Sequence, residues 1–369
     1  MRLKKGSPDY VLIISTCTLL GIGLVMVFSA SSVSASLDYN DAYYYLKKQL
    51  QWAAIGMACM VLAMKFNYNK LKLLGWPLFI IVLAGLVLVL TPLGIEVNGA
   101  TRWLGIEPYF RVAPAEIAKI TIIMFLARYL EVNIDNIKSF SKGLAPVLLY
   151  TALVCGLILA QNDLGTSFTL AGSVFLMIHV AGARLSHMAL LTVSGISLVA
   201  GAVYLEPYRF NRIMAFLDPW QYPYDIGYQS IQSLYALGSG GLLGQGLGLS
   251  KQKYFYLPEE HTDFIFAVLG EELGFIGVAI VLTLFVLVAW RGYKIALNAP
   301  DIYGNLLAAG ITTVIVFQAA INIGVVAGCL PVTGITLPFI SYGGSSLVFS
   351  MIGIGLLLNV SRFSINRNV

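Results

Sequence analysis

The chain has 369 residues, of which 58% are hydrophobic and only 11% are charged. Soluble globular domains carry roughly 25% charged residues, so a water-soluble fold of this length could not bury so much apolar surface. The formal net charge of +5 does not indicate nucleic-acid binding, because no basic patch with interleaved aromatic residues stands outside the apolar segments. The composition therefore predicts an integral membrane protein.

Ten apolar segments have the length of a membrane-spanning helix. Each is close to the ~20 residues that cross ~30 Å of hydrocarbon, and helices are expected because lipid cannot satisfy a free backbone. The first segment is longer than the apolar region of a signal peptide, which predicts a retained helix. We expect one all-α, polytopic membrane domain over residues 1–369. The predicted spans are 10–31, 47–66, 73–92, 114–131, 143–160, 164–181, 187–205, 263–290, 303–327 and 342–360.

Basic residues are distributed unevenly between the two sides of this predicted bundle. Fourteen of the 23 Lys and Arg residues fall on one side, which the positive-inside rule assigns to the cytoplasm. Both termini are therefore predicted to be cytoplasmic, as an even number of spans requires. The fourteen are Arg2, Lys4, Lys5, Lys65, Lys70, Lys72, Arg128, Lys138, Lys142, Arg184, Arg291, Lys294, Arg362 and Arg367.

The four cysteines predict neither a disulfide framework nor a zinc site. None has CxxC spacing, and three of them lie inside apolar runs, as small buried residues commonly do. They are Cys17, Cys59, Cys155 and Cys329.

The opposite side, predicted to be extracytoplasmic, carries the longer connections: 93–113, 206–262 between spans seven and eight, and 328–344. The 206–262 connection is rich in aromatic residues, which argues against disorder. Its glycine-rich run, 238–248, follows no strand and lacks a Walker lysine, so it predicts a flexible or close-packed hairpin. The stretch 331–346 is too rich in Gly and Pro for a plain helix and predicts a re-entrant segment along an outer cavity.

Asp263 is the candidate catalytic residue, at the outer start of a long apolar helix. Partial desolvation there raises the pKa of a carboxyl group, which suits a general base near neutral pH. The alternative is an ordinary helix cap or first-turn acid. The titratable neighbours Glu259, Glu260 and His261 favour a functional site.

Other polar residues of the outer side are candidates for binding an anionic substrate. Glu116 and Lys119 share one helix face within a span, so they either face a cavity or form a structural ion pair. Arg102 offers a planar donor fork suited to phosphate, or it anchors its loop. Asp163 is either a turn-capping residue or part of the site. Five further outer cations suggest an anionic ligand: Arg111, Arg209, Arg212, Lys251 and Lys253.

Five blocks together resemble the SEDS (shape, elongation, division, sporulation) family in matching order and topology across almost the whole chain. They are 98–104, 114–119, 161–166, 258–274 and 330–346. The short tails and the sequences at residues 7–9 and 359–362 most resemble the division and sporulation branch of the family (FtsW and SpoVE) rather than the rod-elongation branch (RodA). Two blocks depart from the family pattern: Ala113-Pro-Ala-Glu116 replaces Gln-Pro-Ser-Glu, and Gln161-Asn-Asp163 replaces Gln-Pro-Asp.

The resemblance implies an inverting glycosyltransferase that polymerises lipid II at the outer face of the bacterial cytoplasmic membrane, during cell division or spore formation. The family's essential aspartate falls on Asp263, its intramembrane Glu and Lys on Glu116 and Lys119, and its loop arginine on Arg102. Expected partners are lipid II, undecaprenyl pyrophosphate-linked glycan, a class B penicillin-binding protein, other division proteins and membrane lipids. The expected substrate-binding residues are Arg102, Glu116, Lys119, Asp163, Lys251, Glu259, His261, Ser341 and Ser345.

No metal ligand set is predicted, although Mg²⁺ or Mn²⁺ could assist departure of the pyrophosphate. Two other functions stay open. A lipid II flippase needs a polar path across the membrane, whereas the inner halves of these spans are apolar. A non-enzymatic scaffold of the division machinery would need neither the buried pair Glu116 and Lys119 nor an acid at Asp263.

Overall fold

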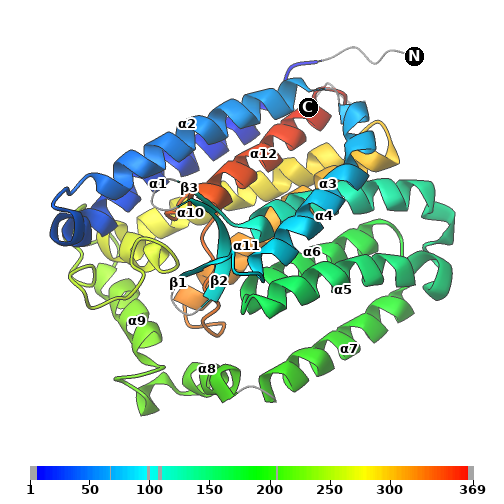
Figure 1. Ribbon diagram of the computed structural model, residues 1–369. Coiled ribbons are helices and arrows are strands. Elements are labelled where there is room, and N and C mark those ends of the chain that lie inside the picture. The colour runs from blue at the N-terminus through cyan, green and yellow to red at the C-terminus, as the bar shows by residue number, and fades with distance from the viewer. Residues whose placement is uncertain (1–5, 67, 98–99, 107–109, 205–206, 365–369) are drawn as a thin grey trace.

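A computed structural model of the chain describes residues 6–66, 68–97, 100–106, 110–204 and 207–364. It shows a bundle of long helices with a small sheet and two short helices at one end (Figure 1). Asn98, Gly99 and Glu206 of the predicted outer connections lie outside the described residues, as do Arg2, Lys4, Lys5 and Arg367 of the termini.

Every predicted span coincides with a helix. Within the described residues, six are long and apolar enough to cross a membrane, namely α1, α3, α10, α11, α12 and α5 with the turn before it. The helices α2 and α4 carry more charge, while α6 and α7 have shorter apolar stretches. The bounds are α1 Tyr10–Tyr39, α2 Tyr44–Lys65, α3 Tyr68–Val89, α4 Pro114–Val132, α5 Ala145–Ala160, α6 Leu164–Val180, α7 Leu185–Tyr204, α10 Ile265–Leu297, α11 Ile302–Val326 and α12 Gly344–Ser361.

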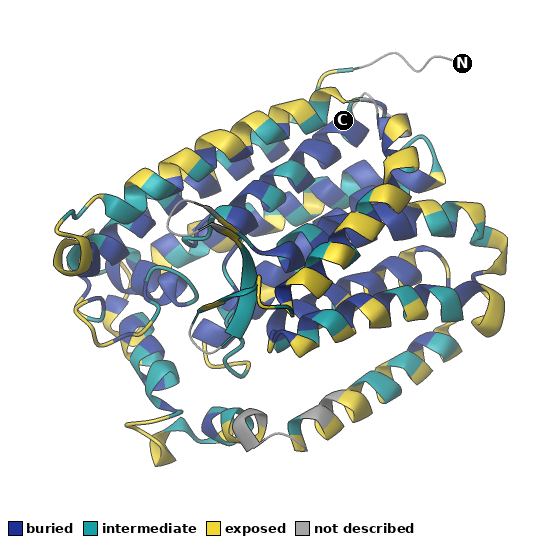
Figure 2. Ribbon diagram, viewed as in Figure 1, coloured by how far each residue is buried: buried dark blue, intermediate teal, exposed yellow. Residues whose placement is uncertain are grey.

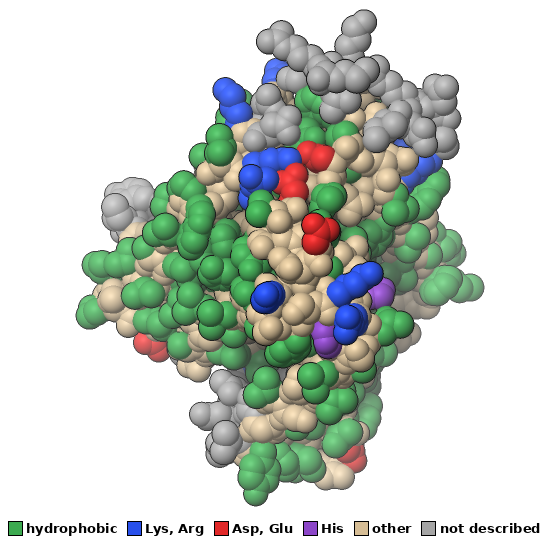
Figure 3. Space-filling model, turned by 90° about the vertical axis from the view of Figure 1, so that its right-hand side faces the viewer, with side chains coloured by type: hydrophobic (Ala, Val, Ile, Leu, Met, Phe, Trp, Pro, Cys, Tyr) green, Lys and Arg blue, Asp and Glu red, His purple; other side chains and the backbone are tan. Residues whose placement is uncertain are grey.

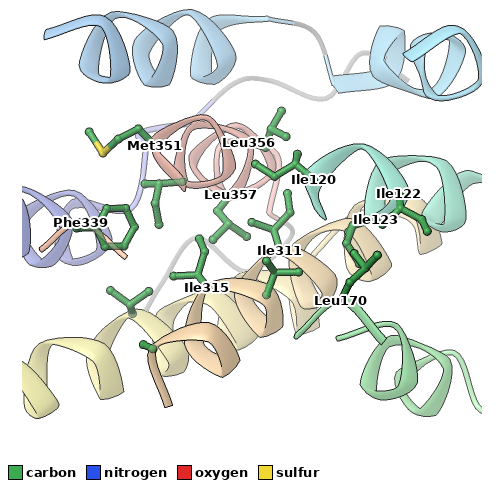
Figure 4. Close-up of a cluster of buried hydrophobic side chains, with 14 of the residues drawn as sticks. Ile120, Ile122, Ile123, Leu170, Ile311, Ile315, Phe339, Met351, Leu356 and Leu357 are labelled. Carbon is green, nitrogen blue, oxygen red and sulfur yellow. The ribbon is translucent and has the colours of Figure 1, made fainter. Parts of the chain in front are cut away.

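The helix α11 forms the centre of the bundle, where it packs against α4, α6, α10 and α12. Figure 4 shows Ile311 and Ile315 of α11 among the side chains of these neighbours, including Ile123 of α4. Small residues let the backbones approach, because a Cβ at Gly310 would lie 2.5 Å from Ile123. Close packing of this kind drives helix association in lipid, where the hydrophobic effect between helices is absent.

The outward faces of the helices carry exposed apolar side chains, whereas the inward faces are buried (Figure 2). The helix α7 shows this most clearly, because it lies at the periphery and exposes Leu190, Val193 and Ile196. Such a surface is stable against hydrocarbon and unfavourable in water.

The prediction that residues 93–113 form a loop is wrong in part, because the segment contains a three-stranded antiparallel sheet in the order β1-β2-β3. The register pairs Val97 with Ala100 and Leu104 with Val112. The sequence gives little warning of it, since two of the strands have only three residues. The strands are β1 Ile95–Val97, β2 Ala100–Ile106 and β3 Phe110–Val112.

The 206–262 connection is ordered, as its aromatic residues predicted. It forms α8 (Pro207–Leu217), a 3₁₀ turn η3 (Pro219–Gln221) and α9 (Tyr228–Gly240), none of which the sequence reasoning anticipated. Together with the sheet, these elements cover the end of the bundle at which α10 begins (Figure 1).

The other end of the bundle gathers the described parts of both termini and the connections predicted to be cytoplasmic (Figure 1). Lys and Arg side chains are spread over this end, with acidic side chains and histidines among them (Figure 3). Ion pairs join the elements here: Arg291 contacts Asp9, the cap of α1, at 2.6 Å, and Lys72 bridges Glu131 and Asp301 at 2.7 and 2.8 Å. The sequence therefore sorted the two ends correctly, and which end faces the cytoplasm stays a prediction.

A break interrupts α10 at Gly274, where φ is 64° and ψ is −165°. The glycine-rich run after α9 fills the break and satisfies its backbone, so the close-packed form of the predicted hairpin is confirmed. This arrangement is required because unpaired backbone is not tolerated against lipid. The four bonds are Gln245 N to Glu271 O (2.9 Å), Gly246 N to Glu272 O (3.0 Å), Phe275 N to Gly241 O (2.9 Å) and Ile276 N to Leu242 O (3.2 Å).

We expect Gly274→Ala to destabilise the fold. A side chain at this combination of φ and ψ, a region essentially restricted to glycine, costs roughly 1–3 kcal/mol, and its Cβ would lie 2.3 Å from the Gly244 nitrogen. The thermal unfolding midpoint of the detergent-purified chain should therefore fall. The matched control is Gly195→Ala in α7, where a Cβ meets nothing within 4 Å, and which should leave the midpoint equal or higher. Equal midpoints for both variants would contradict the role assigned to the break.

Candidate active site

Asp263 lies two residues before α10, outside the membrane-spanning helix, and is held by contacts from distant parts of the chain. The side-chain amide of Asn322 in α11 donates to the Asp263 carbonyl (2.8 Å) and to the Ile335 carbonyl (2.6 Å). The Asp263 carboxylate lies beside Gly334, where a Cβ would be 3.5 Å from Oδ2. Asp263 is thus fixed between α11 and the irregular segment before α12.

That segment, residues 331–343, is the predicted re-entrant element, and its non-helical backbone is confirmed. It is joined directly to the residues before Asp263. The Ser341 hydroxyl donates to the Thr262 carbonyl (2.7 Å), and the Tyr342 amide donates to the His261 carbonyl (2.9 Å). Gln49 of α2, fully buried, donates to the Ser341 carbonyl (3.0 Å). Buried hydrogen-bonded contacts of this kind fix a single geometry.

The surroundings of Asp263 raise its pKa to about 7. Burial is the largest cause, the neighbouring Glu259 carboxylate adds to it, and the cation of Arg102 opposes both. Glu259 itself occupies the left-handed region at φ 57° and accepts a hydrogen bond from the Thr262 hydroxyl (2.6 Å). A non-glycine residue in that region stores strain, which is common at functional sites.

Arg102 of β2 reaches the turn before α6, where its Nη2 donates to the Asn162 carbonyl and its Nε lies 4.0 Å from Asp163 Oδ2. Asp163 also caps α6, since its Oδ1 accepts from the Thr166 amide (2.9 Å). Both residues act electrostatically on Asp263, Arg102 lowering and Asp163 raising its pKa. The two interpretations of Asp163, cap and site residue, are therefore compatible.

Arg212 of α8 is a further cation of the site, although the sequence named it only as one of several outer cations. Its Nη1 donates to the Val332 carbonyl (2.9 Å), and its charge also lowers the pKa of Asp263. No local pattern marks Arg212, because the contact depends on how α8 folds back over the 331–343 segment.

Lys119, which is buried, and Glu116, which is partly buried, form an ion pair of 2.8 Å in α4 and line a small cavity of about 10 Å³, room for about one water molecule. The Lys119 ammonium also donates to Gln318 Oε1 (2.6 Å), and the Gln318 amide donates to the Thr336 carbonyl (2.9 Å). The ion pair is confirmed, and a role of either residue in binding substrate stays a prediction. The pair reaches the 331–343 segment through Gln318 of α11.

Three other predicted substrate-binding residues lie close to these elements. The Ser345 hydroxyl accepts from the Ala113 amide (3.2 Å), joining α12 to the start of α4. The His261 ring packs on Tyr45 at a centroid distance of 4.4 Å. Lys251 is exposed, and its backbone amide donates to Glu271 (2.9 Å). Their contact with substrate stays a prediction.

Glu271 and Glu272 are functional candidates that the sequence reasoning missed. The Glu272 carboxylate accepts from the Lys253 ammonium (3.0 Å) and from the Ser29 hydroxyl of α1 (2.6 Å), with the Lys253 and Glu272 side chains only 2% and 0% exposed. The Glu271 carboxylate accepts from the Ser250 hydroxyl and the amides of 251 and 252. Two adjacent acids inside an apolar run are a recognisable signal. They anchor the outer loop to α10.

The chain matches the model of the FTSW_RODA_SPOVE family, described as cell cycle protein, over residues 10–366. It belongs to this family. It is 48% identical over 365 residues to the stage V sporulation protein E of Bacillus subtilis (strain 168), covering 99% of this chain and all of the relative. It is 43% identical over 354 residues to the probable peptidoglycan glycosyltransferase FtsW of Geobacter metallireducens, covering 96% and 94% of the two chains.

Solved structures agree with this assignment. A chain from a study of structural coordination of polymerization and crosslinking by a peptidoglycan synthase complex superposes with a TM-score of 0.80 at 33% identity, covering 97% and 98% of the two chains. The Thermus thermophilus rod shape determining protein RodA gives 0.72 at 29% identity, covering 97% and 98%. The higher identities to the sporulation protein and FtsW confirm the predicted branch.

We expect Glu272→Ala to destabilise the chain strongly, because it leaves Lys253 buried without its counter-ion. Breaking a buried pair from one side costs about 3–5 kcal/mol. The double variant Glu272→Leu with Lys253→Met should recover much of the lost unfolding midpoint, since it removes both charges. The matched control is Lys47→Ala, which breaks the exposed pair with Asp41 (2.7 Å) and should cost at most about 1 kcal/mol. If Glu272→Ala lowered the unfolding midpoint no more than this control does, the stabilising role of the buried pair would be refuted.

Proposed function

We propose that this chain is a peptidoglycan glycosyltransferase that polymerises lipid II into glycan strands at the outer face of the bacterial cytoplasmic membrane. The observation that carries the proposal is Asp263, a carboxyl group with a pKa of about 7 that lies among Arg102, Arg212 and the re-entrant segment. A base of that strength beside fixed cations suits attack by a sugar hydroxyl on a pyrophosphate-linked sugar. The FtsW relatives are named as probable peptidoglycan glycosyltransferases, which supports the same activity.

In this mechanism, Asp263 removes the proton from the 4-hydroxyl of the acceptor's N-acetylglucosamine. The oxygen forms a bond to C1 of the donor's N-acetylmuramic acid as the bond from C1 to the pyrophosphate oxygen breaks, so the anomeric centre inverts. The proton stays on Asp263 until it exchanges with solvent. Holding both sugars in one orientation lowers the entropic part of the barrier.

Arg102 and Arg212 are placed to stabilise the negative charge that develops on the leaving pyrophosphate. Arg102 has a planar fork of donors, of which one is engaged by the Asn162 carbonyl, and such forks suit phosphate oxygens. Among the described residues, no group of three His, Cys, Asp or Glu side chains is arranged to hold a metal ion. Mg²⁺ or Mn²⁺ could assist the pyrophosphate, and no step is assigned to either ion.

Glu116 and Lys119 act on the site through the 331–343 segment rather than on the reacting atoms. Their pair orients Gln318, whose amide binds the Thr336 carbonyl. The segment that faces Asp263 is thereby held from inside the bundle. Buried charges that are fully hydrogen-bonded rigidify their surroundings.

The partner proposed for this enzyme is a class B penicillin-binding protein that cross-links the new strands. The similar solved chain comes from a peptidoglycan synthase complex that couples polymerization with crosslinking, which supports the proposal. Similarity to both the sporulation protein and FtsW supports a role in spore formation or in cell division. We place both termini in the cytoplasm on the basis of the positive-inside rule.

We expect Asp263→Asn to abolish polymerisation of labelled lipid II by the purified chain and its penicillin-binding partner. A general base contributes about 10²–10⁴-fold to the rate, and the amide keeps the shape of the carboxyl. Asp225→Asn, at an exposed position of the same outer loop, is the matched control and should polymerise normally. Polymerisation by Asp263→Asn at the wild-type rate would falsify the base assignment. If no variant polymerises and wild type moves lipid II across liposomes, the flippase function replaces the transferase.

The pH dependence of kcat/KM should show an acidic limb with a midpoint near 7, because Asp263 must be deprotonated to act as a base. Glu259→Gln removes a negative charge that raises the pKa of Asp263, so the midpoint should move to lower pH. Arg102→Gln removes a positive charge that lowers this pKa, so the midpoint should move to higher pH. Shifts of opposite sign distinguish electrostatics from structural damage, and an unmoved midpoint in both variants argues against Asp263 as the titrating group.

A further inference from the structure

A second concave site lies at the end of the bundle opposite Asp263. It is a pocket of about 400 Å³ between the α4–α5 connection and the start of α7. Residues 135, 136 and 138–140 line one side, and Arg184 and His187 line the other. Nothing in the proposed glycosyl transfer uses this pocket.

The pocket carries cations that have no partner. Within the described part of the chain, neither the Lys138 ammonium nor the Arg184 guanidinium makes an ion pair or a hydrogen bond, and both side chains are exposed. Asp135 is the one acidic side chain among the lining residues. The balance of charge in the pocket is therefore positive and favours an anion.

His187 adds a polar atom that the protein leaves unsatisfied. Its Nδ1 is buried and has no hydrogen-bond partner among the described residues, while its ring packs edge-on against Phe140 at a centroid distance of 5.6 Å. A buried polar atom without a partner is unfavourable unless a ligand or water completes it. Because no surface of Nδ1 is open to the pocket, the His187 ring forms part of the pocket wall and is not a phosphate ligand.

Apolar surface continues from the pocket along the helices that flank it. Leu149 of α5 and Leu190 and Val193 of α7 are 69%, 54% and 64% exposed. These side chains belong to the lipid-facing surface of the bundle, so acyl chains of the surrounding bilayer lie next to the pocket. The combination of a basic pocket at a helix-bundle end with exposed apolar flanks is the pattern of a phospholipid headgroup site.

We propose that this pocket binds the phosphate of an anionic phospholipid of the phosphatidylglycerol class, with its acyl chains along α5 and α7. Arg184 and Lys138 contact the phosphate oxygens, Arg184 through its planar fork, and the His187 ring lines the pocket beside them. The lipid would fix the start of α7 against the α4–α5 connection, at the end where this otherwise peripheral helix meets the bundle. The proposal does not depend on the glycosyltransferase activity.

The test is native mass spectrometry of the detergent-purified full chain with equimolar phosphatidylglycerol and phosphatidylcholine. Wild type should retain phosphatidylglycerol about tenfold or more in preference to phosphatidylcholine, because each juxtamembrane cation contributes measurably to anionic-lipid binding. The double variant Lys138→Gln with Arg184→Gln should lose this preference. The charge-conserving variant Lys138→Arg with Arg184→Lys should keep most of it.

The matched control removes two exposed cations from the same end but outside the pocket, Lys65→Gln with Lys70→Gln, and should bind like wild type. Unfolding midpoints in phosphatidylcholine confirm that all variants are folded. The proposed site would be overturned if the control variant lost the preference for phosphatidylglycerol equally, or if the pocket variant kept it. Displacement of the lipid by millimolar inorganic phosphate would also overturn it, because the pocket would then serve a soluble phosphate.

Discussion

The position of the proposed catalytic acid depends on a buried ion pair that lies well away from it. Lys253 and Glu272 are almost wholly removed from solvent, and the adjacent Glu271 carboxylate accepts hydrogen bonds from residues 250–252, near the end of the outer loop. Burying such charges is costly unless every one is paired and hydrogen-bonded. Glu272 is paired with Lys253 and Glu271 is hydrogen-bonded, so residues 250–253 are fixed against α10. The chain runs from there to Asp263, just before the start of α10.

The same segment is restrained a second time where it returns. Asn322, Ser341 and Gln49 bind backbone groups of the Asp263 region and of the 331–343 segment. Restraint from α2, α11 and the re-entrant segment together leaves Asp263 little freedom. The strained backbone of Glu259 persists because these surrounding contacts over-determine it.

The pKa of Asp263 is set by opposing contributions from its surroundings. Burial and the carboxylates of Glu259 and Asp163 raise its pKa, while Arg102 and Arg212 lower it. The same carboxyl in water, with a pKa near 3.9, would be a weak base. The two arginines have a second role in the proposed mechanism. Their positive charges lower the pKa of Asp263 and also stabilise the negative charge on the leaving pyrophosphate. In these proposals the two ends of the bundle have different roles, glycosyl transfer at one and binding of an anionic lipid at the other.

Local sequence determined much of this protein, because hydrocarbon requires each span to satisfy its own backbone as a helix. The lengths of apolar runs therefore predicted a helix in each of the ten segments, and the three-residue spacing of Glu116 and Lys119 placed both on one helix face. Asp263 could be identified from its place at a helix start and from the family blocks. Only the tertiary structure decided the sheet at 95–112, the break of α10 at Gly274 and the contacts of Gln49, Asn322 and Arg212. The last three contacts join segments tens to hundreds of residues apart in the chain. Tertiary packing decides whether such distant side chains meet, and a local sequence pattern does not predict it.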